Sequence, residues 1–136
     1  MAEVELLQLH DARLEEAVLR IGGSALLRFA HVTVYERKAP ELYDVVSYGA
    51  EAVCTGVTDM HCVGAFDDRS KISGLLIDGT ELSSAEETAL LHAEHRSSAN
   101  VALVFFGGAR IELACARISF RLQQRGRVIE VWEGPL

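Results

Sequence analysis

Two adjacent polar residues near the start of the chain, His10 and Asp11, form the pair best suited to chemistry. An aspartate can hold an imidazole in one tautomer for proton transfer, and its carboxylate can also bind a cation. His31, in the next strand-like segment, is a third candidate. An aspartate here is equally suited to capping a turn before a strand. We therefore treat His10, Asp11 and His31 as candidate catalytic residues, with turn and surface roles as the alternative.

The candidate metal ligands are His92 and His95. They lie three positions apart in a segment that we expect to be helical, so both imidazoles point to the same side. A zinc site needs further protein ligands, nothing nearby in the sequence supplies one, and the stronger H-E-x-x-H pattern is absent. Histidines near the end of a helix also suit the negative end of its dipole. We therefore expect no metal site and no cofactor.

The three cysteines, Cys54, Cys62 and Cys115, all lie in apolar runs. Their odd number rules out complete pairing within the chain, and their surroundings are typical of buried free thiols. The acidic start Met-Ala-Glu-Val-Glu lacks the positive region of a signal peptide, and no apolar run approaches the ~20 residues of a membrane span. Together these features predict a protein of the reducing cytoplasm that does not enter a membrane.

The composition is that of one ordinary domain covering residues 1–136. Hydrophobic residues make up 49% of the chain and charged residues 24%, and the net charge is -7. An acidic balance argues against nucleic-acid binding, because neutralising phosphates requires clustered lysine and arginine. Several arginines do cluster between Arg110 and Arg127, but we interpret them as solvated positions on the outside of a strand pair.

A predicted hairpin organises the C-terminal part of the chain. Two apolar, β-prone runs flank Gly107-Gly108, which predicts a two-residue turn. This register pairs Val104 with Ile111 and predicts a core face made of Ala102, Val104, Phe106, Ala109, Ile111, Leu113 and Cys115. The alternation then changes phase between Cys115 and Ile118, which predicts a β-bulge near Ala116–Arg117.

The opposite face of this hairpin is predicted to be a self-association surface. It carries Val101, Leu103 and Phe105 on one strand and Arg110 and Glu112 on the other. These apolar side chains need a cover, and a second copy of the same sheet can provide one about a twofold axis. We therefore expect a homodimer.

The remaining segments predict further strands and one helix, with a turn at 123–126 followed by a last strand at 128–132. Residues 84–96 follow a capping box begun by Ser83 or Ser84, which predicts an α-helix. Residues 12–21 fit a helical face or a strand; the Gly22-Gly23 that follows favours a strand paired with residues 25–35. We predict a mainly β fold, an antiparallel β-sandwich or open barrel of about eight strands with one α-helix at about 84–96.

Scattered motifs resemble those of small bacterial β-rich proteins. They are His10-Asp11-Ala12-x-Leu14, Gly56-Val57, and Gly107-Gly108-x-x-Ile111-x-Leu113-x-Cys115-x-Arg117-Ile118. Some of these proteins are similar to immunity proteins of contact-dependent toxin systems. The resemblance implies a sandwich-like domain that binds a partner protein, and acidic charge is common in such proteins because many toxin nucleases are basic.

From these observations we expect a cytoplasmic, non-enzymatic module that binds a protein or associates with itself, without nucleic acid or membrane. The alternative is a small-ligand-binding barrel or an enzyme with a His/Asp site. A converging polar cluster in a pocket would favour this alternative, whereas an exposed apolar patch would favour the interaction module.

Overall fold

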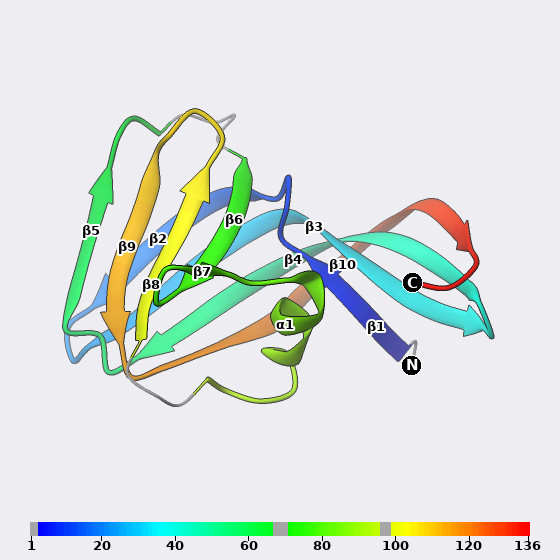
Figure 1. The fold of residues 1–136 in the computed structure, drawn as a ribbon, viewed down its shortest axis with the longest axis horizontal. Helices are drawn as coiled ribbons and strands as arrows, with labels where there is room; N and C mark the ends of the chain where they lie inside the picture. Colours follow the sequence, from blue (N-terminus) through cyan, green and yellow to red (C-terminus); the bar gives the residue numbers. More distant parts are fainter. Residues whose placement is uncertain (1–2, 67–70, 96–98) are drawn as a thin grey trace.

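A computed structural model describes residues 3–66, 71–95 and 99–136, which form two antiparallel sheets and one short helix (Figure 1). The first sheet has the order β1-β3-β4-β10, with β2 also paired to β3. Its strands are β1 (Glu3–Gln8), β2 (Arg13–Arg20), β3 (Ser24–Ala39), β4 (Leu42–Thr55) and β10 (Arg117–Glu133). The second sheet has the order β5-β9-β8-β6-β7, formed by β5 (Asp59–Val63), β9 (Arg110–Cys115), β8 (Ala99–Phe105), β6 (Ile72–Ile77) and β7 (Thr80–Glu81).

The two sheets bury a shared apolar core. In β3, β8 and β9 alternate residues point inward, as the period of two requires, and side chains such as Phe29 from the first sheet and Phe105 from the second are buried in one cluster. Most of the described residues lie in these strands. This arrangement confirms the predicted mainly β, sandwich-like class.

The β8–β9 hairpin is present, but its predicted register is wrong by one residue. The Phe105 amide donates to the Ala109 carbonyl at 2.9 Å, so the loop has three residues, Phe106 to Gly108, and Leu103 pairs with Ile111. A one-residue shift on one strand moves its side chains to the opposite face. Phe105 is therefore buried in the core, whereas Phe106 is 51% exposed at the loop tip.

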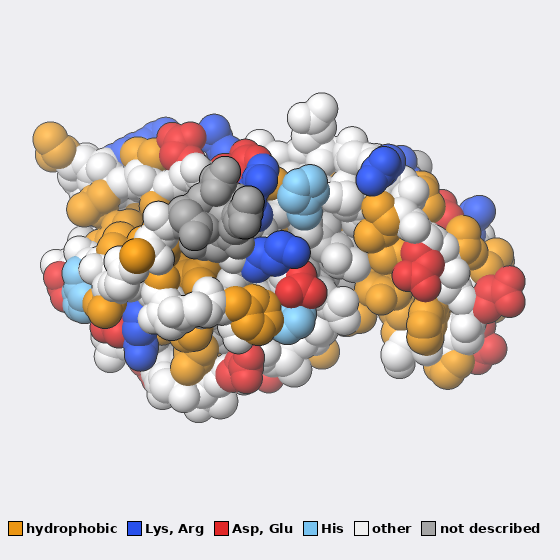
Figure 2. Space-filling view, turned by 90° about the horizontal axis from the view of Figure 1, so that it is seen from above, with side chains coloured by type: hydrophobic (Ala, Val, Ile, Leu, Met, Phe, Trp, Pro, Cys, Tyr) orange, Lys and Arg blue, Asp and Glu red, His pale blue; other side chains and the backbone are white. Residues whose placement is uncertain are grey.

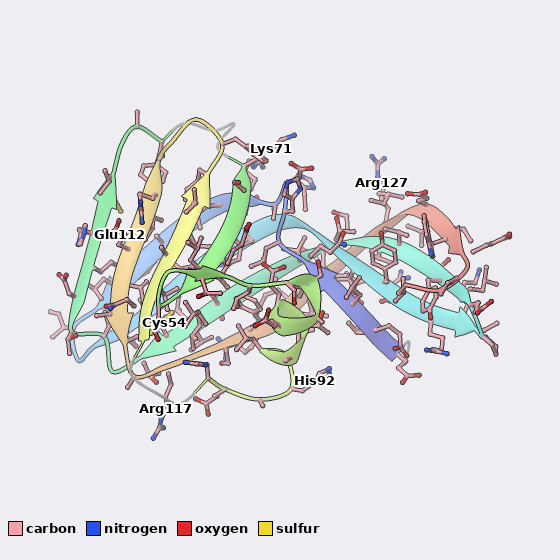
Figure 3. All side chains as sticks on the ribbon, in the orientation of Figure 1. Cys54, Lys71, His92, Glu112, Arg117 and Arg127 are labelled. Carbon is pink, nitrogen blue, oxygen red and sulfur yellow. The ribbon has the colours of Figure 1, made fainter. Side chains whose placement is uncertain are left out.

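This shift separates the residues of the predicted self-association face. Val101, Leu103 and Phe105 are each only 2% exposed and pack in the core between the sheets. Arg110 and Glu112 lie on the outer face of the second sheet, joined by an ion pair of 2.7 Å (Figure 3). The five residues thus do not form one surface, because the apolar three are already covered by the other sheet.

The change of phase after Cys115 marks a crossing between sheets and not the predicted bulge. β9 ends at Cys115 in the second sheet, and β10 begins at Arg117 in the first. The Ala116 amide donates to the Thr55 carbonyl at 3.0 Å as the chain crosses. Cys115 and Ile118 both face the core, Cys115 from the second sheet and Ile118 from the first.

The helix α1 (Ser84–Ala89) is shorter than predicted. Its capping box is confirmed: the Ser83 hydroxyl accepts from the Glu86 amide, and the Glu86 carboxylate accepts from the Ser83 amide. Beyond Ala89 the chain leaves the helix, and His95 pairs its backbone with Ile118 of β10. Turn hydrogen bonds continue as far as the Ala93 amide, and the Phe120 amide of β10 donates to the Leu90 carbonyl at 2.9 Å, so pairing with β10 begins directly after α1. Arg96, at the end of the predicted helix, lies outside the described residues.

Two further segments settle the strand pattern. Residues 13–20 form β2, paired with β3 across a loop containing Gly22 and Gly23, which confirms the favoured interpretation of this segment. The predicted turn at 123–126 is wrong, since β10 continues through it as one strand of 17 residues.

The outer halves of β3, β4 and β10 leave the sandwich and, with β1, form a projecting arm (Figure 1). We define the arm as residues 3–8, 32–39, 42–48 and 125–133. The first sheet bends at Gly49, where both neighbouring strands bulge: the register shifts between Phe29 and Val32 on β3 and between Leu122 and Arg125 on β10. Bulges on both sides of one residue increase the local twist and redirect the strands.

Candidate functional site: the apolar edge of the arm

The predicted catalytic residues do not assemble into one site. His10 and Asp11 form a solvent-exposed pair, with Nδ1 and Oδ2 3.3 Å apart, in the turn between β1 and β2. His31 lies in the β3 bulge, where its Nδ1 is 3.4 Å from the Ser47 hydroxyl, and no hydrogen bond or ion pair joins it to either of the other two. Asp11 and His31 both have positive φ, at 68° and 61°, which matches the tight turn and the bulge that contain them.

The two histidines considered as metal ligands lie just beyond α1. His92 is exposed just beyond α1, and the backbone of His95 is paired with β10. Among residues 3–66, 71–95 and 99–136, no group of three or more His, Cys, Asp or Glu side chains is placed to hold a metal ion.

The cysteines divide into a buried pair and one exposed thiol. Cys54 from the first sheet and Cys115 from the second meet inside the sandwich, where hydrogen bonding between the thiols and burial raise the pKa of Cys54 (Figure 3). Cys62 is exposed, so the prediction that it is buried is wrong. Its strand, β5, is at the edge of the second sheet, and none of the described strands pairs with its outer side.

Exposed apolar side chains concentrate at the end of the chain. Among the described residues, ten large hydrophobic side chains are exposed, and five of them fall within residues 128–136: Val128, Ile129, Val131, Trp132 and Leu136. Their exposed fractions are between 41% and 52%. Figure 2 shows hydrophobic side chains gathered along the arm. Such a concentration is characteristic of an interaction surface, whereas single exposed apolar residues are ordinary.

The edge position of β10 explains this exposure. β10 is the last strand of the first sheet, and none of the described strands pairs with its outer side. Val131 is paired with Asp44 and Trp132 with Tyr43, so successive side chains point to opposite faces of the arm. The second sheet, which covers the first in the sandwich, does not extend over the arm (Figure 1). We call residues 125–133 the apolar edge, because apolar side chains lie on both faces of a strand whose outer side pairs with none of the described strands.

A buried polar cluster anchors the beginning of the apolar edge. Glu36 of β3 is only 2% exposed; it accepts from Arg125 of β10, with Nη2–Oε1 2.8 Å, and from the Tyr48 hydroxyl of β4 at 2.5 Å. The guanidinium lowers the pKa of Glu36, while burial and the neighbouring carboxylate raise the pKa of Tyr48. The cluster therefore joins β3, β4 and β10 at one point.

The other end of the apolar edge is also held. The Gly134 amide donates to the Glu41 carbonyl at 2.8 Å, and the Trp132 indole donates to the Pro135 carbonyl at 3.3 Å. The edge is thus fixed at both ends while its outer side stays open, which makes it a preformed surface for strand addition.

Charges are distributed unevenly along the apolar edge. Arg125 and Arg127 occupy its beginning, and Glu130 and Glu133 its end. Arg127 projects outward from β10 (Figure 3). Within the described parts of the chain, Arg127, Glu130 and Glu133 form no ion pair with one another or with other side chains. These three charges are therefore available to a partner.

No protein-family model, curated protein or solved structure matches this chain. The candidate site therefore rests on the geometry described above.

The helix among the described residues, α1, has six residues and is too short to cross a membrane.

Sequence reasoning predicted a strand at 128–132 but did not identify it as a site. The available signal was the apolar character of Val128, Ile129, Val131 and Trp132, which occupy both even and odd positions. A strand that is half buried has one polar face. A strand that is apolar on both faces must be covered on both, and the arm does not provide that cover.

Proposed function

We propose that this protein is a non-enzymatic, cytoplasmic interaction module that binds a protein strand along the apolar edge of its arm. The observation that carries the proposal is an open strand edge with Val131 exposed on one face and Trp132 on the other. Strand addition supplies main-chain hydrogen bonds for affinity, and alternate side chains supply specificity. Natural proteins normally protect such edges, because they template pairing with other chains.

Other properties support a protein partner. The net charge of -7 disfavours nucleic acid. The three cysteines are unpaired, as is usual in a reducing cytoplasm. The candidate catalytic residues His10, Asp11 and His31 are not joined into a reactive set. The resemblance to toxin-system immunity proteins agrees with a protein-binding role in bacteria.

A second candidate function is small-ligand binding at the bend of the first sheet. A depression of about 320 Å³ lies there, and its lining includes His31, Ser47, Gln123 and Gln124. These side chains offer an imidazole, a hydroxyl and two amides to a small polar molecule. A ligand bound at this place should perturb the His31 ring resonances, and the substitution His31→Ala should remove its binding.

Photo-crosslinking from inside living cells tests the proposed function. A benzophenone amino acid replaces Ile129 in the apolar edge or, as a matched control, Val63 at the edge of the second sheet; both side chains are about half exposed. We expect protein adducts from position 129, their loss when Trp132→Glu is added, and few adducts from position 63. Absence of adducts at position 129, or equal adduct formation at both positions, would refute a role for the apolar edge.

A further inference from the structure

We infer that the protein bound by the apolar edge is a second copy of this chain, with the two β10 strands antiparallel about a twofold axis between Val128 and Ile129 and with Arg127 opposite Glu130 of the second copy. This inference rests on the proposed function and specifies its partner. It replaces the self-association surface predicted from the sequence, whose apolar residues lie in the core.

A twofold axis allows the apolar edge to pair with its own copy. Two identical strands related by a twofold axis perpendicular to the sheet pair antiparallel, and each supplies the strand that the other lacks. The first sheet then continues from one copy into the next, and neither arm retains an open β10 edge. Apolar side chains on each face of the edge strand gain a cross-strand neighbour from the second copy.

The order of charges along β10 also favours pairing with a second copy. Arginines precede the apolar residues, and glutamates lie within and after them. An antiparallel copy reverses this order, so the basic beginning of each strand faces the acidic end of the other. The edge is therefore complementary to itself, whereas a strand with one sign of charge throughout would repel its copy.

Residues opposite each other across this axis must lie on the same face of the sheet. The bulge at Ile129 changes the alternation of β10: Val128 pairs with Val46 and Glu130 with its neighbour Val45, so Val128 and Glu130 point to opposite faces and Arg127 shares the face of Glu130. An axis between Val128 and Ile129 then places Arg127 opposite Glu130 twice and Val128 opposite Ile129 twice. An axis through Ile129 places Val128 opposite Glu130, and an axis through Glu130 places that carboxylate opposite itself. Like charges directly opposite each other destabilise a strand pair. The first register therefore combines opposite charges with apolar contact.

The bulges of β10 favour pairing with a strand of matching shape over pairing with an arbitrary flat strand. Its register against β4 shifts between Arg125 and Val128 and again between Val128 and Glu130, and Ile129 has no partner in β4. A bulged edge twists away from arbitrary flat strands. A second copy has the same bulge, and the twofold axis lies beside it, so the two bends are matched.

Charge reversal tests this inference on the purified full-length chain by sedimentation equilibrium. We expect a dimer for the natural sequence. Arg127→Glu and Glu130→Arg should each weaken dimerisation at least about tenfold, because each creates two like-charged pairs. An equimolar mixture of these two variants should form a heterodimer, since opposite charges then face each other at both positions. The double variant should dimerise with itself again.

Arg20→Glu is the matched control, because Arg20 is exposed on β2 and forms no ion pair with described residues. It should leave dimerisation unchanged. Circular dichroism checks that each exposed substitution keeps the fold. A monomeric natural chain, a dimer insensitive to both reversals, or a mixture that stays monomeric would overturn the inference.

Further outcomes distinguish the failure of this inference from the failure of the proposed function. If the purified chain is monomeric but position 129 crosslinks to another protein in cells, the second copy is wrong and the proposed function stands. If neither dimer nor crosslink forms, both fail. Cosedimentation of the chain with phosphatidylserine vesicles, lost in Trp132→Glu, would also overturn the inference in favour of a lipid surface.

Discussion

Protonation of the buried Glu87 should control the stability of the fold between about pH 5 and pH 8. Glu87 is 5% exposed where α1 packs on β1, and its Oε1 accepts from the Leu9 amide at 3.3 Å. The next residue, Thr88, accepts from the Leu7 amide at 2.8 Å. Burial raises the pKa of Glu87 from 4.5 to about 7; the Leu9 hydrogen bond opposes this shift and the charge of Glu81 adds to it.

The sign of the effect follows from proton linkage. Between about pH 4.5 and 7 the unfolded chain releases the Glu87 proton while the folded chain retains it. The stabilisation associated with this proton is complete below the unfolded pKa and is lost as the pH rises through the folded pKa. A shift from 4.5 to about 7 corresponds to about 3 kcal/mol in the free energy of unfolding, as an order of magnitude.

Glu87→Gln should remove this dependence. The uncharged amide keeps an oxygen for the Leu9 amide and cannot ionise, so the variant should gain stability relative to the natural chain as the pH rises. We expect a small difference near pH 5 and about 2–3 kcal/mol near pH 8, measured by urea denaturation. Subtracting the two curves cancels the titration of all other groups.

Glu94→Gln is the matched control, because Glu94 is an exposed carboxylate just beyond α1. Its stability should follow the natural chain at every pH. A constant difference between Glu87→Gln and the natural chain across this range would refute the reasoning, since it would show that Glu87 ionises equally in the folded and unfolded states. A difference that grows as the pH falls would contradict the sign.

Three further predictions concern the thiols, the arm and metals. Cys62 should react with a thiol reagent in the native protein, whereas Cys54 and Cys115 should react only after unfolding; three fast thiols would contradict their burial. Gly126→Ala should destabilise the chain by about 1–3 kcal/mol in thermal denaturation, because its Cβ would lie 2.4 Å from a backbone oxygen of β4. Gly49→Ala, whose Cβ would have 3.7 Å to its nearest neighbour, is the control and should cost less. Exhaustive chelation should leave the melting temperature unchanged, and a fall of several degrees would indicate a metal ligand set.

Local patterns predicted the elements whose signal lies within a few residues. The Gly22-Gly23 and Gly107-Gly108 pairs each mark a hairpin, because glycine adopts positive φ without steric cost. The capping box at Ser83 correctly locates the start of α1. In each case the hydrogen bonds that decide the structure join residues close in sequence.

Predictions that depended on a distant partner were less accurate. The β8–β9 hairpin allowed a two-residue or a three-residue loop, and packing against the other sheet decides that Phe105 and not Phe106 is buried. The end of α1 is set by pairing with β10, and the exposure of Cys62 is set by the edge position of its strand. These outcomes depend on which strands become neighbours, and that information lies far away in the chain.

The sequence by itself determined a β-rich chain with an acidic surface, free thiols and two glycine hairpins, because composition and a period of two depend only on nearby residues. Tertiary structure alone decided that β10 crosses to the first sheet after Cys115 and leaves the sandwich at the Gly49 bend. Residues 128–132 look like an ordinary core strand in the sequence. They are exposed because the second sheet does not extend over the arm. Whether a strand face is buried depends on how the two sheets pack in the folded protein.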